Sequence, residues 1–164
     1  MDYSKLKYFS VNYCEFSDYY KDELHKFLDK SFNLPSYELY DFTIVNGFTF
    51  NGEIIGVLSI LKTEDLKKVL ENNNNDEMTG YSKKGEGGLF IYNVVVKDDF
   101  KRKKLAEILI NLCLKDNSNE QYLHAQVKKE NEPSFNLFFK CGFQIEDEMQ
   151  DGDNNQVCVM SRNI

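Results

Sequence analysis

A cluster of basic residues follows the most strongly apolar stretch of the chain. Residues 89–96 read LFIYNVVV, which is typical of a buried strand, and residues 97–104 then carry five Lys or Arg and two Asp. Leu105, Ile108 and Leu109 next repeat at helical spacing. A basic turn between a strand and a helix start suits a phosphate, because the first helical N–H groups lack internal partners. The alternative is a plain strand–helix connection with a solvated turn.

The composition is that of one ordinary globular domain. The 164 residues carry 29% charged and 41% hydrophobic side chains, so we expect a single domain over residues 1–164. No apolar run reaches the length of a membrane span, and no secretory signal is visible, so we expect no membrane partner. The four scattered cysteines lack metal-ligand spacing and favour reduced thiols in the cytoplasm, with no metal site. The net charge of −7 argues against nucleic acid.

The elements around this unit predict one sheet. Two β-rich runs, 42–50 and 53–61, are joined by Asn51-Gly52, which favours a tight hairpin. Residues 62–87 are polar and Asn-rich, and we interpret them as a mobile insertion between strands or as a lid over a site. Residues 121–127 form a strand after the central helix.

The C-terminal third predicts a short helix and a last hairpin. Asn131 and Pro133 mark the start of the helix, and Gly142 marks its end. Two further strands, 143–148 and 156–160, complete the order β-α-(α)-β-β-β-α-β-α-β-β. The predicted fold class is α/β (α+β), with a single mixed, mostly antiparallel sheet and helices on both faces.

Two motifs resemble the GCN5-related N-acetyltransferases, the GNAT family. The family's turn, Q/R-x-x-G-x-G/A after a strand ending in Val, corresponds to residues 101–106 after 94–96. Its second pattern, N-x-x-A/S-x-x-L-Y-x-K-x-G-F, has seven residues in register here: Asn131, Ser134, Leu137, Phe138, Lys140, Gly142 and Phe143. The resemblance covers about residues 5–162 and implies the acyl-CoA N-acyltransferase fold.

The resemblance implies acetyl-CoA as the acyl donor and a set of residues that hold it. The backbone of Val94, Val95 and Val96 would hold the pantetheine arm as an added strand, and Asn131 would hydrogen-bond this arm or merely cap its helix. The interruption at Asn93 would correspond to the family's β-bulge. The phosphates would lie at the turn made of Lys101, Arg102, Lys103, Lys104, Leu105 and Ala106.

Two positions depart from the family pattern. Lys104 replaces the glycine whose backbone lies against the pyrophosphate, so its side chain costs room, although its ammonium can neutralise a phosphate. Phe138 stands where many members carry the tyrosine that protonates the departing thiolate, and phenylalanine has no proton to give. Phe138 would then border the cofactor, or simply pack in the core.

Two residues are candidates for handling the proton of the acceptor amine. Tyr92 lies in the region of the central strand where family members often place a Glu, and it could orient a water or simply pack. His124 titrates in a suitable range and lies on the neighbouring strand, although a lone strand histidine is also a common structural residue.

The activity implied by the resemblance is direct transfer of acetyl from acetyl-CoA to a primary amine in a ternary complex. Five acids in the last hairpin favour a cationic small-molecule or peptide acceptor; they are Glu146, Asp147, Glu148, Asp151 and Asp153. A monomer or a homodimer fits this interpretation. The rival is a weak or inactive relative that keeps the fold as a CoA-binding or interaction module, since Lys104 and Phe138 depart from the family pattern.

Overall fold

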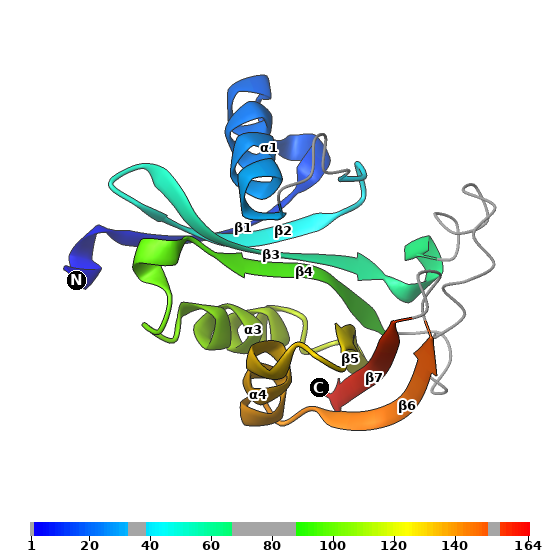
Figure 1. The fold of residues 1–164 in the computed structure, drawn as a ribbon. Helices are drawn as coiled ribbons and strands as arrows, with labels where there is room; N and C mark the ends of the chain where they lie inside the picture. Colours follow the sequence, from blue (N-terminus) through cyan, green and yellow to red (C-terminus); the bar gives the residue numbers. More distant parts are fainter. Residues whose placement is uncertain (1, 33–38, 67–87, 151–154) are drawn as a thin grey trace. The chain divides into compact units, whose positions relative to one another are not determined.

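A computed structural model describes residues 2–32, 39–66, 88–150 and 155–164. Its strands form one seven-stranded mixed sheet in the order β1-β2-β3-β4-β5-β7-β6 (Figure 1). The strands are β1 (Leu6–Asn12), β2 (Ile44–Phe50), β3 (Glu53–Lys62), β4 (Leu89–Val96), β5 (Tyr122–Lys128), β6 (Gln144–Gln150) and β7 (Gln156–Asn163). The helices are α1 (Asp18–Phe32), α3 (Leu105–Asp116) and α4 (Glu132–Lys140).

The pairing directions agree with the predicted mixed sheet. The pairs β1–β2, β2–β3, β5–β7 and β6–β7 are antiparallel, whereas β4 and β5 are parallel. Element bounds differ from the prediction by one to a few residues; the strand expected from residue 42, for example, begins at Ile44. The expected insertion is described only to residue 66, where residues 63–66 are helical. Its remainder lies outside the described residues.

The chain divides into two compact units, and the division passes through β4 and α3. The first unit comprises Met1–Ile60 and Asn93–Leu109, and the second comprises Leu61–Tyr92 and Ile110–Ile164. Each unit is therefore built from segments far apart in the sequence.

Helices cover both faces of the sheet in the first unit. Leu24 and Leu28 of α1 are fully buried in a cluster with Val45 and Val57. The next position on β3, Gly56, faces the other way, and a Cβ built there would lie 3.5 Å from Leu109 of α3. The β2–β3 hairpin turns at Asn51 and Gly52, whose φ angles of 52° and 85° are those that a type I′ turn requires.

The second unit is held by α4 and the β5–β7–β6 strands (Figure 1). Asn131 caps α4, with its side-chain oxygen accepting from the Ser134 N–H at 3.2 Å, and Pro133 occupies the first turn. The helix ends before Gly142, whose φ of 81° is left-handed, as the sequence predicts. Phe138 packs edge-on against Phe143, with ring centroids 5.0 Å apart. Among the described helices, none has the length and apolar character that a membrane span requires.

Candidate active site

The basic turn between β4 and α3 has a fixed conformation. A short 3₁₀ turn, Asp98–Phe100, follows β4, and the Lys101 N–H donates to the Asp98 carbonyl at 3.1 Å. The Phe100 ring packs against Phe50, with centroids 5.4 Å apart. The turn is thereby attached to the sheet of the first unit just before α3 begins.

The backbone of this turn has the geometry of an anion-binding nest. Arg102 and Lys104 both adopt left-handed φ angles, 59° and 60°, and Lys103 between them does not. Alternation of this kind points successive N–H groups toward one concave side, where they attract an anion. Within the described parts of the chain, the N–H groups of residues 102–107 have no hydrogen-bond partner. The turn therefore offers unsatisfied donors together with the positive end of the α3 dipole.

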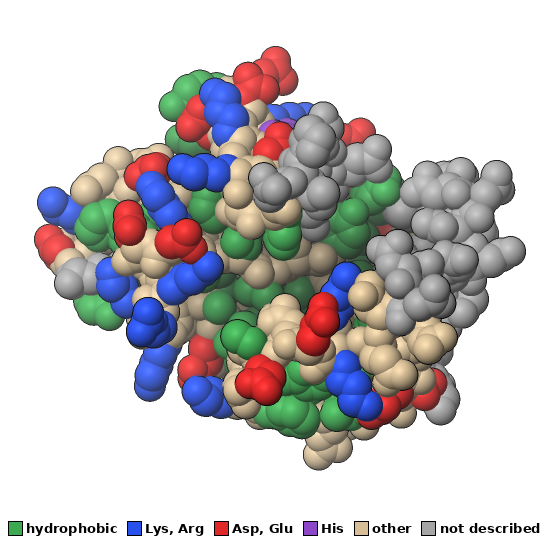
Figure 2. All heavy atoms as spheres, in the orientation of Figure 1, with side chains coloured by type: hydrophobic (Ala, Val, Ile, Leu, Met, Phe, Trp, Pro, Cys, Tyr) green, Lys and Arg blue, Asp and Glu red, His purple; other side chains and the backbone are tan. Residues whose placement is uncertain are grey.

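The four basic side chains at positions 101–104 fall into two groups, of which one makes local contacts and the other does not. Lys101 forms an ion pair with Asp98 at 2.6 Å, and Lys103 donates to the Asp99 carbonyl at 2.8 Å while lying over the Phe100 ring. Arg102 and Lys104 are exposed and have no partner among the described residues. Figure 2 shows Lys and Arg side chains gathered, among Asp and Glu, around the segment that joins β4 to α3. Arg102 and Lys104 are thus the cations available to a bound phosphate.

Lys104 holds a strained conformation, because a side chain disfavours left-handed φ. Lys104→Gly is expected to raise the free energy of unfolding by about 1 kcal/mol, because glycine removes the Cβ clash. The greater conformational entropy of glycine in the unfolded chain offsets part of this gain. Urea denaturation measures the change. Lys104→Ala removes the same charge but keeps the Cβ, so it should show no gain. An equal gain in both variants would assign the effect to charge instead of conformation.

The residues of the central strand lie in different surroundings. Val95 packs with the α1 cluster, Val96 is buried near Gly56, and the Lys97 N–H donates to the Ile55 carbonyl at 2.8 Å. Tyr92 belongs to the second unit and packs on Leu61, Leu66 and Phe90. The parallel pairing of β4 with β5 runs from Leu89 opposite Leu123 to Ile91 opposite Ala125.

His124 lies in an aromatic layer of the second unit. It is 1% exposed, with its ring 5.1 Å from that of Phe90 and 5.7 Å from that of Tyr122. Neither ring nitrogen has a hydrogen-bond partner among the described residues. Burial lowers the pKa of His124 to about 4, and the negative charge of Glu146 opposes this effect. The imidazole is therefore neutral at neutral pH.

The predicted site residues fall into two groups. Val94, Val95 and Val96, together with Lys101, Arg102, Lys103, Lys104, Leu105 and Ala106, belong to the first unit. Tyr92, His124, Asn131 and Phe138 belong to the second. Asn131 caps α4, and Phe138 is 3% exposed. Asn131 thus has the capping role, and Phe138 the core position, that the sequence left open as alternatives.

The acids predicted to guide a cationic acceptor are partly engaged. Glu148 pairs with Lys129 at 2.8 Å, and Asp147 accepts from the Glu148 N–H at 3.0 Å. Glu146 accepts a hydrogen bond from the Ser161 hydroxyl. Asp151 and Asp153 lie outside the described residues.

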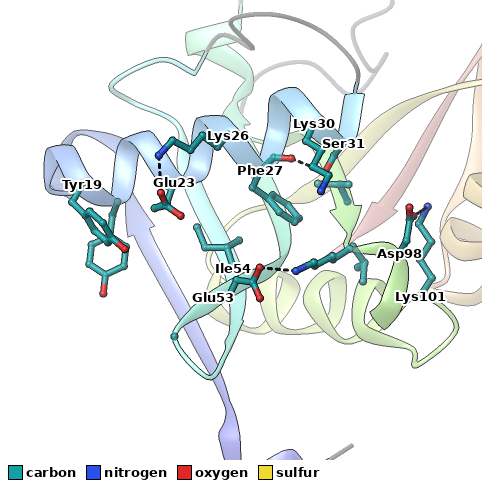
Figure 3. Close-up of a pocket in the computed structure, with 15 residues that line it drawn as sticks. Tyr19, Glu23, Lys26, Phe27, Lys30, Ser31, Glu53, Ile54, Asp98 and Lys101 are labelled. Atoms are coloured by element: carbon teal, nitrogen blue, oxygen red, sulfur yellow. Dashed lines mark hydrogen bonds and ion pairs between the residues drawn. The ribbon is translucent and has the colours of Figure 1, made fainter.

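A pocket of about 320 Å³ in the first unit was not predicted from the sequence (Figure 3). It lies between α1 and the ends of β3 and β4, and Val95, Val96 and Lys101 contribute to its lining. Its rim carries three ion pairs: Lys26 with Glu23, Lys97 with Glu53 and Lys101 with Asp98. The polar residues of α1 look like an ordinary solvated face in the sequence, so nothing there signals the pocket.

Comparison with known proteins defines the class of this fold. Arabidopsis thaliana NAA60 in complex with acetyl-CoA matches with a TM-score of 0.70 and 16% identity, covering 97% of this chain and 99% of that one. Arabidopsis thaliana Naa50 with the bisubstrate analogue CoA-Ac-MVNAL matches at 0.69 and 16%, covering 98% and 99%. The ribosomal-protein-S18-alanine N-acetyltransferase of Escherichia coli matches at 0.68 and 12%, covering 96% and 94%. The architecture is therefore that of the acyl-CoA N-acyltransferases.

The sequence itself identifies the family. Residues 9–143 match the model of the Acetyltransferase (GNAT) family. The chain belongs to this family and is accordingly an acyltransferase. No curated protein matches the sequence.

Proposed function

We propose that this chain transfers the acetyl group of acetyl-CoA to a primary amine by direct attack in a ternary complex. The observation that carries the proposal is the turn at Arg102 and Lys104. There, left-handed backbone occurs together with N–H groups and two cations that have no partner in the part of the chain that the structure describes. This combination is the chemistry that a pyrophosphate needs. We propose further that residues 1–164 act as one functional domain.

Acetyl-CoA supplies an activated acyl carbon as a thioester, and the residues of this chain bind and orient it. Arg102, Lys104 and the first N–H groups of α3 would hold the phosphates. The backbone of Val94–Val96 would pair with the pantetheine arm and donate to the developing oxyanion, and the Asn131 amide would add a contact to that arm. The amine nitrogen forms a bond to the acyl carbon while the carbon–sulfur bond breaks.

The proton of the amine has a base available in the second unit. His124 is neutral at neutral pH and has both ring nitrogens unpaired among the described residues, so it would accept the proton, and Tyr92 would orient the acceptor or a water. Phe138 is a hydrocarbon and has no proton for the leaving thiolate, so this proton would come from water or from the amine itself.

The acceptor that we propose is the amine of a peptide or of a cationic small molecule. The neighbours support a peptide amine, because one is named for the alanine of a ribosomal protein and another was crystallised with a CoA-linked peptide. The acidic β6 supports a cationic acceptor, since its carboxylates attract positive charge. The four free thiols support the reducing cytoplasm as the compartment, with the protein acting as a monomer or homodimer.

The experiment that tests the proposal is amine-dependent release of CoA. Wild-type protein is incubated with acetyl-CoA and a panel of peptides and small amines, and free thiol is followed with a chromogenic reagent. We expect at least one amine to raise thiol release above the rate with acetyl-CoA alone, with a matching mass increase in that amine. Saturable CoA binding without release from any amine would favour the rival, a CoA-binding module, for which Phe138 is the specific argument.

A further inference from the structure

Three polar side chains lie side by side across β5, β7 and β6 of the second unit. His124 is directly opposite Ser161 in the antiparallel register of β5 and β7, so both side chains are on one face of the sheet. The Ser161 hydroxyl donates to the carboxylate of Glu146 on β6. Opposite residues have Cβ atoms about 5 Å apart, and neither ring nitrogen of His124 bonds to the Ser161 hydroxyl directly, so one water would join the two groups.

A β-bulge places Glu146 in this row. The pairing of β6 with β7 shifts between Ile145, opposite Met160, and Asp147, opposite Val159. Glu146 is therefore the extra residue of the bulge, and its carboxylate accepts the Ser161 hydroxyl. Bulges of this kind commonly redirect a side chain next to a functional site.

His124 and Ser161 are polar side chains in a buried part of the sheet. His124 is 1% exposed and Ser161 is 3% exposed, while Glu146 is half-buried. The described groups that face the His124 ring are Phe90 on β4, Tyr122 on β5 and Ser161 on β7, and Glu146 on β6 is the charge that acts on it. A buried imidazole that has no hydrogen-bond partner within the described ranges needs an explanation, and a bound water or a reacting group would supply one.

We propose that Ser161 and Glu146 form the proton outlet of His124. As His124 accepts the proton of the attacking amine at one ring nitrogen, the proton on its other nitrogen passes to the Ser161 hydroxyl, and the hydroxyl proton passes to the Glu146 carboxylate. The amine loses one proton and Glu146 gains one, while His124 exchanges tautomers and Ser161 is unchanged. This inference rests on the proposed function, and it makes Ser161 and Glu146 positioning residues for the base.

The outlet answers a difficulty in the proposed chemistry. Burial holds the pKa of His124 near 4, so an imidazolium in this layer is an unfavourable place for the proton to remain. Glu146 is half-exposed and lines a cavity of about 300 Å³ together with Ser161 and Arg162. A carboxylate there can pass the proton to solvent.

The first test is independent of activity and uses the small number of histidines. The chain has two, His25 and His124, so ¹⁵N-histidine labelling gives two assignable rings. As the pH falls from about 7 to about 4.5, we expect wild-type His124 to begin to protonate, because its pKa is about 4. In Glu146→Gln this protonation should shift to lower pH. Glu148→Gln, which removes a carboxylate two residues away that is paired with Lys129, should behave as wild type.

The second test is kinetic and uses the best acceptor found for the wild type. Glu146→Gln and Ser161→Ala are each expected to lower kcat about tenfold or more with acetyl-CoA affinity unchanged, as for loss of a proton-transfer group. In Ser161→Ala, which keeps every carboxylate of β6, the KM of the acceptor should also be unchanged. Glu120→Gln, which removes a carboxylate of the second unit that is paired with Lys62 and has no role in the proposed chemistry, should keep the wild-type kcat. Thermal unfolding of each variant checks whether the fold is retained.

The outcomes separate the two proposals. An unchanged His124 titration in Glu146→Gln, or a wild-type kcat in that variant, overturns the outlet and leaves the acetyltransferase proposal standing. Wild-type protein that releases no CoA with any amine overturns the acetyltransferase proposal and the outlet with it. A shifted titration in Glu146→Gln together with a lower kcat at constant KM in Ser161→Ala supports both.

Discussion

Arg102→Glu is expected to raise the dissociation constant of acetyl-CoA by about tenfold to a hundredfold, since a hydrogen bond to a charged group contributes about 1.5–3 kcal/mol. Lys104→Glu should act in the same direction. Both residues sit in the anion nest, and neither has a partner among the described residues that would compensate for the lost contact. Calorimetry with acetyl-CoA, repeated at higher salt, measures the effect, which should shrink as salt screens the charges.

Two control variants give this prediction its specificity. Lys115→Glu makes the same change in net charge at the far end of α3, so any general repulsion of an anionic ligand is equal in both proteins. Lys101→Glu should have a smaller effect than Arg102→Glu, because Lys101 is already paired with Asp98. If Arg102→Glu and Lys115→Glu weaken binding equally, the turn does not hold the phosphates.

Features that depend on a few neighbouring residues are predictable from this sequence. Asn51-Gly52 has the two positive φ angles that its hairpin needs, and Asn131 and Gly142 mark the two ends of α4. In each case the determining interaction lies within one turn of the chain, so residue type alone indicates the geometry.

Features that depend on contacts between distant strands are not predictable in the same way. The row of His124, Ser161 and Glu146 requires the register of three strands and one bulge, and a shift by one residue would turn each side chain to the other face. The sequence likewise gives equal weight to all four basic residues of the turn. Only the folded structure shows that Lys101 and Lys103 are engaged locally, whereas Arg102 and Lys104 are available.

His124 is also expected to make the stability of the protein depend on pH. Burial depresses its pKa from an ordinary 6.5 to about 4 in the folded state, so between these values the unfolded chain binds the extra proton and the folded chain does not. The free energy of unfolding should therefore be fully expressed above about pH 7 and fall as the pH falls, with about 2 kcal/mol lost from this group by about pH 5. The loss should continue until the pH reaches the folded pKa.

A phenylalanine at position 124 isolates this effect. His124→Phe keeps an aromatic ring between Phe90 and Tyr122 but cannot bind a proton, so its stability should fall less than that of the wild type between about pH 7.5 and about pH 5. Urea denaturation at both pH values measures the difference, and His25→Phe, at the other histidine of the chain, serves as the control. Parallel losses in wild type and His124→Phe would mean that the imidazole takes up its proton as readily in the folded state as in the unfolded state. Burial in the aromatic layer would then not disfavour the imidazolium, and the lowered pKa that keeps His124 neutral in the folded protein would be excluded.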